Sequence, residues 1–421
     1  MTQRAAGDVQ ATRPAIQAPV SPLSPAAPHD AMHAPPRPKR QRDGVLIGAV
    51  GLLLLIGILA VFTASDSAAL QGHLMWSAVG ITAAGVVATI GDYRLIQRWS
   101  PLLFIGLIGL LVLVLLVGQE VNGSTRWLFG GSVQPGELAK LVVVIYIADW
   151  LSGRPHEIRQ FAVGLVPFIV LVSLVCGLII LQPNFSTAIL VLGIASAMLV
   201  AAGARIDQML MSGSIAVVVL TGALIMADYR VSRVLGFLNA SGMADGANWQ
   251  PNLVQGAVLR GGWFGVGLGN GQYKHFMPLS TGATDAVFAV IGEETGVLGC
   301  LLVVALFATV AWRGMRIARG APDPFAKLAA LGVTWWIVSQ AFVHMAVVTR
   351  LIPFTGVPLP FISSGGSSLT TTLVGVGLLV AISQRVDPAK VTPYGLVDFR
   401  WWNRRSRVSR AYRARRAGLA G

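Results

Sequence analysis

The hydrophobic and polar positions of the chain alternate in long blocks, without the short periods of a soluble domain. Apolar runs of 17 or more residues recur between residues 44 and 384, and short polar stretches separate them. Runs of this length predict membrane-spanning helices, because about 20 helical residues cross the hydrocarbon core of a bilayer. The predicted helices cover residues 44 to 64, 74 to 91, 101 to 118, 136 to 152, 161 to 181, 186 to 203, 209 to 229, 284 to 312, 327 to 349 and 366 to 384.

This pattern predicts an all-α polytopic membrane protein with about ten transmembrane helices. The composition agrees, because 54% of the 421 residues are hydrophobic and 12% are charged, against roughly 25% charged residues in soluble domains. Ten spans use about 200 positions, which leaves no room for a folded soluble domain. Cys176 and Cys300 both lie inside apolar runs, so we expect no disulfide framework and no metal cluster.

The two ends of the chain differ from the apolar middle. Residues 1–43 contain eight prolines and few large apolar side chains, which predicts a disordered tail. Residues 44–386 form the predicted membrane domain, and residues 387–421 form a basic tail. Because eight arginines and two tryptophans lie between residues 400 and 416, this tail is expected to lie on an anionic lipid surface.

Positive charge is divided unequally between the two ends of the predicted helices. With a cytoplasmic N-terminus, 25 of the 32 lysines and arginines fall on the cytoplasmic side. This asymmetry predicts a multi-pass protein of the cytoplasmic membrane with both termini inside. It also accounts for the net charge of +14, so we expect membrane lipids, and no nucleic acid, as partners of the basic residues.

A long extracytoplasmic loop, residues 230–283, joins the seventh and eighth predicted helices. It contains an amphipathic piece, from Trp249 to Arg260, and a glycine-rich run from Gly261 to Gly271. The Gly-x-Gly-x-Gly spacing resembles a nucleotide-binding loop, but no strand precedes it, which argues against a dinucleotide-binding fold. Close approach of the backbone to a lipid head group or to neighbouring helices explains the glycines better.

Few acidic residues are available for chemistry at the outer face. The candidates are Asp66, Glu120, Glu137, Asp228, Asp245 and Asp285. Asp285 stands where the long loop enters the eighth predicted helix. From the residues alone, its carboxylate is either a helix cap or a general base.

A second group of polar residues lies between Glu120 and Lys140. Glu137 and Lys140 are three residues apart, so they share one face of the fourth predicted helix. They form either an ion pair without a ligand or part of a site that faces a cavity. Further cations on the same side suit a phosphorylated lipid head group: Arg126, Arg233 and Lys274.

A third segment, Pro353 to Ser368, contains three prolines and two adjacent glycines at the mouth of the last predicted helix. A continuous helix is excluded there, and irregular backbone at this depth is tolerated only where protein or a watery cavity covers it. The helix start at Gly366 could receive an anion. A structural break and a binding element both remain open on these residues.

These residues resemble the SEDS family, the group of FtsW, RodA and SpoVE. The similarity extends over about residues 44 to 386. The elements that carry it are Glu-Val-Asn-Gly and Arg-Trp at 120–127, Gln-Pro-x-Glu-Leu-x-Lys at 134–140, Gln-Pro-Asn at 182–184, the glycine-rich run through Thr-Asp at 265–285, and Leu-Pro-Phe-Ile-Ser-x-Gly-Gly-Ser-Ser at 359–368.

The resemblance implies a peptidoglycan glycosyltransferase that polymerises lipid II on the outer face of the membrane. It implies inversion at the donor sugar, with Asp285 as general base and undecaprenyl pyrophosphate as leaving group. The implied substrate-binding residues are Arg126, Gln134, Glu137, Lys140, Gln182, Arg233, Lys274, Gly365, Gly366, Ser367 and Ser368. Implied partners are a class B penicillin-binding protein with transpeptidase activity and other divisome or elongasome proteins.

Several alternatives stay open on the sequence. A transporter that flips lipid-linked precursors would place ionisable pairs near the membrane midplane, whereas here the polar residues gather at the outer end. A weakly active scaffold of the cell-wall complex is a third class. No metal ligand set is visible, although a pyrophosphate could recruit Mg or Mn with one carboxylate. Septal and side-wall roles are not distinguished.

The sequence also departs from the family pattern near these motifs. The glutamate and histidine that usually precede the catalytic aspartate are missing between Pro278 and Asp285. Ser364 replaces a usual aromatic residue, His344 a frequent asparagine, and Arg350 a small residue. These departures weaken the transfer of detailed residue roles from the family to this chain.

Overall fold

The computed structural model describes most of the predicted membrane domain. The described residues are 42–90, 92–121, 124–128, 133–225, 231–232, 234–235, 237, 249–272 and 284–386. Both predicted tails lie almost entirely outside them, as does much of the loop 230–283. Tail disorder and membrane contact by the basic tail therefore stay predictions.

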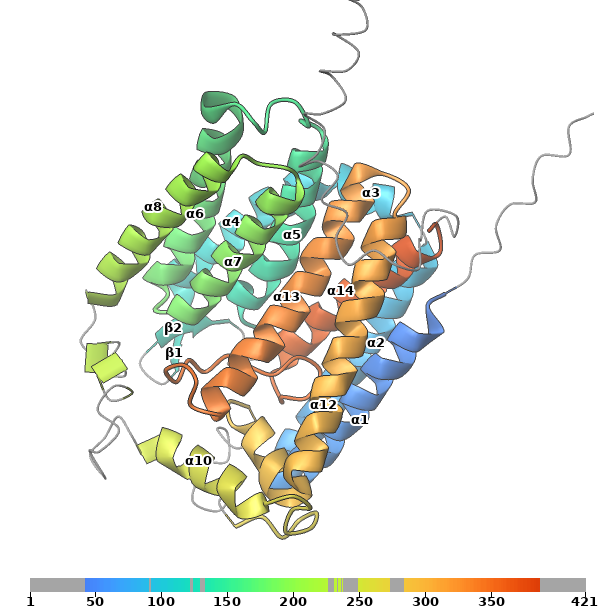
Figure 1. Ribbon diagram of the computed structural model, residues 1–421, viewed down its shortest axis with the longest axis vertical. Coiled ribbons are helices and arrows are strands. Elements are labelled where there is room, and N and C mark those ends of the chain that lie inside the picture. The colour runs from blue at the N-terminus through green and yellow to red at the C-terminus, as the bar shows by residue number, and fades with distance from the viewer. Residues whose placement is uncertain are drawn as a thin grey trace, which may run out of the picture. The chain divides into compact units, whose positions relative to one another are not determined.

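Ten helices of the described residues coincide with the predicted spans (Figure 1). They are α1 (Gly44–Ala64), α2 (Ser67–Ile90), α4 (Ser100–Val117), α5 (Pro135–Ser152), α6 (Val166–Leu181) with the preceding π-helical turn η1 (Phe161–Leu165), α7 (Phe185–Ala201), α8 (Ile206–Ile225), α12 (Val287–Gly320), α13 (Pro324–Val348) and α14 (Gly366–Ser383). Seven described helices are long and apolar enough to cross a membrane, counting η1 with α6. The all-α polytopic architecture is confirmed.

Two helix boundaries differ from their predicted positions. α2 begins at Ser67 instead of about residue 74, because Asp66 accepts a hydrogen bond from the Ala69 amide at 2.9 Å and starts the helix early. α12 continues to Gly320, whereas the predicted span stops at residue 312. Hydropathy marks only the apolar part of a helix, and α12 extends beyond that part with three arginines in its last turns.

Three short elements connect the long helices. A hairpin of β1 (Gln119–Val121) and β2 (Ser124–Trp127) leads into α5, and the sequence did not predict it. The short helix α3 (Tyr93–Arg98) joins α2 to α4. The amphipathic α10 (Trp249–Gly261) packs against α12 at the end where Asp285 lies (Figure 1). We call this end, predicted to face outward, the outer end.

Close helix packing positions the site. α13 contacts α5, α7, α12 and α14 and is buried along much of its length. α2 and α14 approach so closely that a Cβ at Gly377 would lie 2.6 Å from the carbonyl oxygen of Ala84. Small residues permit such approach between membrane helices, where dispersion contacts drive association. The well-packed core therefore lies around α13 and α14.

A break in α12 explains the glycine-rich run. Gly296 has a φ of 68° and interrupts the helix, and residues 261–271, which we call the glycine loop, take up the interrupted backbone groups. The hydrogen bonds run from Val266 N to Glu293 O, Gly267 N to Glu294 O, Val297 N to Gly262 O and Leu298 N to Trp263 O. A Cβ at Gly265 would lie 2.2 Å from Glu294 O. Close approach to a neighbouring helix is thus confirmed as the reason for this glycine.

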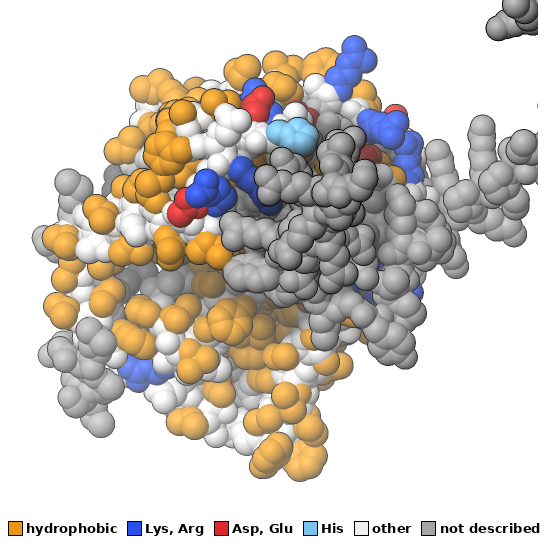
Figure 2. Space-filling model, turned by 45° about the horizontal axis from the view of Figure 1, so that its top comes forward, with side chains coloured by type: hydrophobic (Ala, Val, Ile, Leu, Met, Phe, Trp, Pro, Cys, Tyr) orange, Lys and Arg blue, Asp and Glu red, His pale blue; other side chains and the backbone are white. Residues whose placement is uncertain are grey.

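Charged side chains gather at the end of the bundle opposite to Asp285. Most of the Lys and Arg side chains visible in Figure 2 lie in its upper half, while hydrophobic side chains cover much of the rest. At this end Arg313 pairs with Asp43 at 2.6 Å, and Tyr93 donates to Asp323 at 2.5 Å. The arrangement agrees with the predicted charge asymmetry, and the orientation of the termini stays a prediction.

Candidate functional site

The chain between α13 and α14 is irregular, and several helices hold it. We call residues 353–365 the entry segment. The Ser186 hydroxyl, at the start of α7, donates to the Thr355 carbonyl at 2.9 Å. The Ser363 hydroxyl donates to the Thr284 carbonyl at 2.6 Å, just before α12. The entry segment is therefore tied to the outer ends of two helices that are far apart in sequence.

Asp285 lies against this segment. It is half-buried and precedes Ala286, the N-cap residue of α12. Its neighbour Gly356 has a φ of 65°, and a Cβ added there would lie 3.3 Å from Oδ2 of Asp285. Because a side chain at this position would press on the carboxylate, the bare backbone of Gly356 helps to define where the carboxylate lies.

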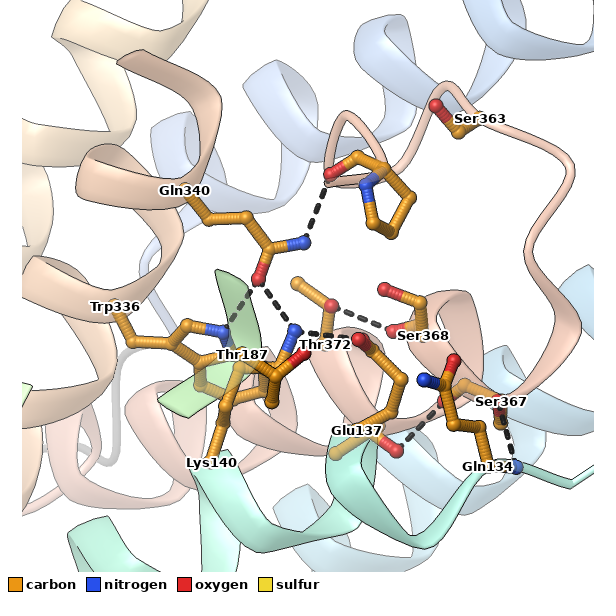
Figure 3. Close-up of polar contacts among 12 residues, drawn as sticks. Gln134, Glu137, Lys140, Thr187, Trp336, Gln340, Ser363, Ser367, Ser368 and Thr372 are labelled. Carbon is orange, nitrogen blue, oxygen red and sulfur yellow. Dashed lines mark hydrogen bonds and ion pairs between the residues drawn. The ribbon is translucent and has the colours of Figure 1, made fainter. Parts of the chain in front are cut away.

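A buried polar cluster lies beneath the entry segment (Figure 3). Lys140 Nζ donates to Glu137 Oε2 at 2.6 Å and to Gln340 Oε1 at 2.7 Å. The indole of Trp336 donates to the same Gln340 oxygen at 2.8 Å. Lys140 is completely buried, and Glu137 is 3% exposed. The predicted shared face of Glu137 and Lys140 is confirmed, and Gln340 and Trp336 complete the cluster.

Two side chains of α13 bind consecutive carbonyls of the entry segment. Gln340 Nε2 donates to Pro358 O at 2.8 Å, and His344 Nδ1 lies 2.7 Å from Val357 O. The two residues are one helical turn apart, so they present a pair of contacts on one face of α13. The cluster around Lys140 is thereby connected to the segment that packs on Asp285.

The helix starts around the entry segment carry partial positive charge. The backbone N–H of Gln134, the residue before α5, donates to the hydroxyl of Ser367 in α14 at 3.3 Å. A Cβ at Gly136 of α5 would lie 3.2 Å from Nδ2 of Asn184, the N-cap residue of α7. Since α12 also begins beside the segment, four helix N-termini gather here. Aligned peptide dipoles make such ends favourable for an anion.

The structure brings only some predicted site residues together. Gln134, Glu137, Lys140 and the helix start at 365–368 form one region at the outer end. Gln182 is buried, and its amide donates to the Leu111 carbonyl of α4 at 3.0 Å. Arg126, in β2, is partly buried. The remaining two predicted cations lie outside the described residues: Arg233 and Lys274.

Sequence reasoning missed several buried polar residues near the site. Trp336 and Gln340 were not predicted, and His344 was identified only as a departure from the family pattern, although polar residues four apart within an apolar helix are a recognisable signal. Glu293 and Glu294, both buried in α12, were also absent from the predicted outer acidic group. They belong to the break in α12, where their carbonyls accept hydrogen bonds from the glycine loop.

The described residues contain no group of three or more His, Cys, Asp or Glu side chains placed to hold a metal ion. Backbone amides at the helix starts around the entry segment are available as donors, whereas Lys140 is already paired with Glu137 and Gln340. Such an arrangement can bind a phosphorylated group and can place one carboxylate, Asp285, beside it.

Comparisons with known proteins agree on one family. The sequence pattern of the family of FtsW, RodA and SpoVE, described as "Cell cycle protein", matches residues 44–387. A probable peptidoglycan glycosyltransferase FtsW from Trichlorobacter lovleyi is 38% identical over 365 residues, which cover 83% of this chain and 95% of that protein. Stage V sporulation protein E of Bacillus subtilis is 36% identical over 360 residues, covering 82% and 98%.

Solved structures show the same fold. A structure described as "Structural coordination of polymerization and crosslinking by a peptidoglycan synthase complex" matches with a TM-score of 0.70 and 26% identity, covering 82% of this chain and 98% of that chain. The rod shape determining protein RodA of Thermus thermophilus matches with a TM-score of 0.62 and 26% identity, covering 82% and 97%.

Proposed function

The chain belongs to the FtsW, RodA and SpoVE family, and from this premise we propose that it is a peptidoglycan glycosyltransferase of the cytoplasmic membrane. It polymerises lipid II into β-1,4 glycan strands on the outer face, with Asp285 as general base. One observation carries the assignment of the base: the carboxylate of Asp285 packs on Gly356, in a segment where four helix starts meet.

The reaction needs one proton acceptor and one place for negative charge. The 4-hydroxyl of a GlcNAc residue attacks the anomeric carbon of the MurNAc on the growing strand, and the bond to undecaprenyl pyrophosphate breaks. The α-linked donor becomes a β-linked product, so a single displacement inverts the anomeric carbon. Asp285 takes the hydroxyl proton, and the pyrophosphate leaves with the electron pair of the broken bond.

The leaving pyrophosphate is stabilised by positive charge at the outer end. Helix starts at α5, α7, α12 and α14 provide partial charge, and we assign further contacts to Arg126, Arg233 and Lys274. Lys140 is buried between Glu137 and Gln340. Direct contact of Lys140 with the substrate stays a prediction, and it requires exchange of these internal partners.

Polymerisation of lipid II by the purified protein, combined with its cognate transpeptidase, tests this function. Wild type is expected to give glycan strands that a gel resolves by length, and Asp285→Ala is expected to give none. Equal strand formation by the two proteins would rule out Asp285 as the base. Transfer of lipid II between vesicle leaflets without strand formation would support a transporter instead, and normal growth with Asp285→Ala would support a scaffold.

A class B penicillin-binding protein is the proposed partner. The structural similarity to a chain of a peptidoglycan synthase complex supports a transpeptidase partner. A relative named FtsW and a rod shape determining protein, RodA, both match this chain, so localisation is needed to distinguish a role at the septum from one at the side wall. A fluorescent fusion at division sites would assign a division role, and one along the cylinder an elongation role.

A further inference from the structure

We propose that Gln340 and His344 are positioning residues for the general base. They act through the entry segment: by holding the carbonyls of Pro358 and Val357, they keep the backbone of Gly356 against the carboxylate of Asp285. The inference rests on the proposed function. It adds a role for two α13 side chains that have no ionic charge in this arrangement.

The chemistry of its partners fixes the orientation of the Gln340 amide. Lys140 and Trp336 offer only N–H donors, so the amide oxygen must face both of them. The amide nitrogen then faces the Pro358 carbonyl, which can only accept. A flipped amide would direct N–H groups at two donors and an oxygen at a carbonyl. Gln340 therefore has one orientation, and that orientation holds the entry segment.

His344 makes the second contact in one tautomer. The Val357 carbonyl is an acceptor, so Nδ1 carries the proton and donates across 2.7 Å. The ring is 1% exposed, and among the described residues no hydrogen-bond partner faces Nε2. A neutral histidine thus serves as a single donor. An asparagine amide at this position could donate to the same carbonyl.

The hydrogen bonds from Gln340 and His344 hold two consecutive residues of the entry segment. Gly356 precedes Val357, and its left-handed φ of 65° turns the backbone toward Asp285. Because both carbonyls are held from one face of α13, displacement of the turn requires loss of both hydrogen bonds or movement of the helix. α13 packs against four other spans, so it provides a rigid reference.

Misplacement of a catalytic group by about 1 Å costs about 10²-fold in rate, and this sets the expected effect. Gln340→Leu is expected to lower kcat for lipid II polymerisation about 10²-fold while KM stays within about twofold, since Gln340 makes no proposed contact with the substrate and Lys140 keeps Glu137 as its partner. His344→Leu is expected to lower kcat similarly. His344→Asn restores the donor, so its kcat is expected to lie within about fivefold of wild type.

Thr334→Val is the matched control. Thr334 is buried in the same helix, and its hydroxyl donates only within α13, to the Ala330 carbonyl at 2.7 Å. This variant also removes one buried hydrogen bond, but it does not touch the entry segment, so wild-type kcat is expected. Monodisperse elution and a cooperative thermal unfolding transition confirm that each variant is folded. Gln340→Glu, which keeps an acceptor for Lys140 and loses the donor to Pro358, replaces Gln340→Leu if that variant does not fold.

The outcomes separate this inference from the proposed function. Wild-type kcat in Gln340→Leu and His344→Leu, with Asp285→Asn inactive, would overturn the positioning role alone. A raised KM with unchanged kcat would also overturn it, because the residues would then contribute to substrate binding. Equal loss in His344→Leu and His344→Asn would contradict a role as hydrogen-bond donor. If wild type forms no strands, the proposed function itself fails.

Discussion

Two irregular, glycine-containing segments lie at the outer end of the molecule, and they satisfy their backbone groups differently. The glycine loop pairs backbone with backbone: its amides and carbonyls take up the groups exposed by the break at Gly296. The entry segment pairs backbone with side chains, through Ser186, Gln340 and His344. Both solutions pair backbone groups near the membrane, where each unpaired backbone group would cost several kcal/mol.

The difference separates a structural element from a functional one. At Gly265 and Gly296 the glycine loop and α12 approach so closely that no Cβ fits, so these contacts involve backbone alone. Side-chain anchoring keeps the entry segment at a distance from α13 and fills the space with donors and acceptors. The two segments also differ in the carboxylate beside them: Glu293 next to the glycine loop is fully buried and paired with Arg260, whereas Asp285 next to the entry segment is half-buried. We therefore place the chemistry at the entry segment and the mechanical support at the glycine loop.

The largest change in stability is expected at the glycine loop. Gly265 has a φ of 79°, and a Cβ there would lie 2.2 Å from Glu294 O. In Gly265→Ala, the left-handed backbone costs about 1–2 kcal/mol and overpacking about 1–3 kcal/mol. Thermal unfolding in detergent should show a marked fall in melting temperature. Polymerisation per folded molecule should stay near the wild-type rate, and a selective loss of kcat with normal stability would contradict the structural assignment.

A matched glycine in the entry segment, Gly356, should affect the turnover rate more than the stability. Gly356→Ala adds a Cβ only 3.3 Å from Oδ2 of Asp285, and neighbouring side chains can accommodate it. The left-handed φ costs about 1–2 kcal/mol. We expect kcat to fall about tenfold, equivalent to about 1.4 kcal/mol in the barrier. Steady-state kinetics together with unfolding measurements check this, and a loss of stability without any loss of kcat would break the comparison.

Ser186→Ala removes one anchor of the entry segment without adding bulk. Its hydroxyl donates to the Thr355 carbonyl at 2.9 Å, and one such hydrogen bond contributes about 1 kcal/mol. The expected result is a severalfold lower kcat and a small fall in melting temperature. Ser186→Thr, which keeps the hydroxyl, is the control. Identical kinetics of the alanine and threonine variants would show that this anchor has no part in positioning.

The smallest effect on activity is expected at the opposite end of the bundle. Tyr93→Phe removes the hydrogen bond to the Asp323 carboxylate and about 1.5–3 kcal/mol of stability. Burial and the neighbouring Asp323 raise the pKa of Tyr93, so the phenol stays protonated at ordinary assay pH. The kcat should equal that of wild type at every pH of the assay. A lowered kcat would mean that the two ends of the bundle are coupled.

The spans could be predicted from the sequence because hydropathy depends on local composition. Even α5 is correctly predicted despite the charges of Glu137, Lys140 and Asp149. The hairpin β1–β2 could not be predicted from the sequence, since a few polar residues carry no periodic signal. Likewise, helix ends beyond the apolar part depend on individual caps such as Asp66.

Some contacts of the candidate site could likewise be predicted from local sequence, and others depend on tertiary packing. The contact of Glu137 with Lys140 follows from their spacing on one helix. Gln340, by contrast, is 200 positions from Lys140, and only the packing of α13 on α5 brings them together. The position of Gly356 beside Asp285 is also set by tertiary structure, because Gly356 comes from a different part of the chain. Local patterns could therefore identify Glu137, Lys140 and Asp285, but not the partners that these residues find on other helices.

The initial rate of lipid II polymerisation by Asp285→Asn tests the central claim most directly. Asparagine keeps the shape of the side chain and removes its ability to accept a proton. Asp66→Asn, at another outer helix start, is the matched control because asparagine retains its capping oxygen. We predict a fall of at least about 10²-fold for Asp285→Asn and a wild-type rate for Asp66→Asn. A wild-type rate in a correctly folded Asp285→Asn protein would contradict the account.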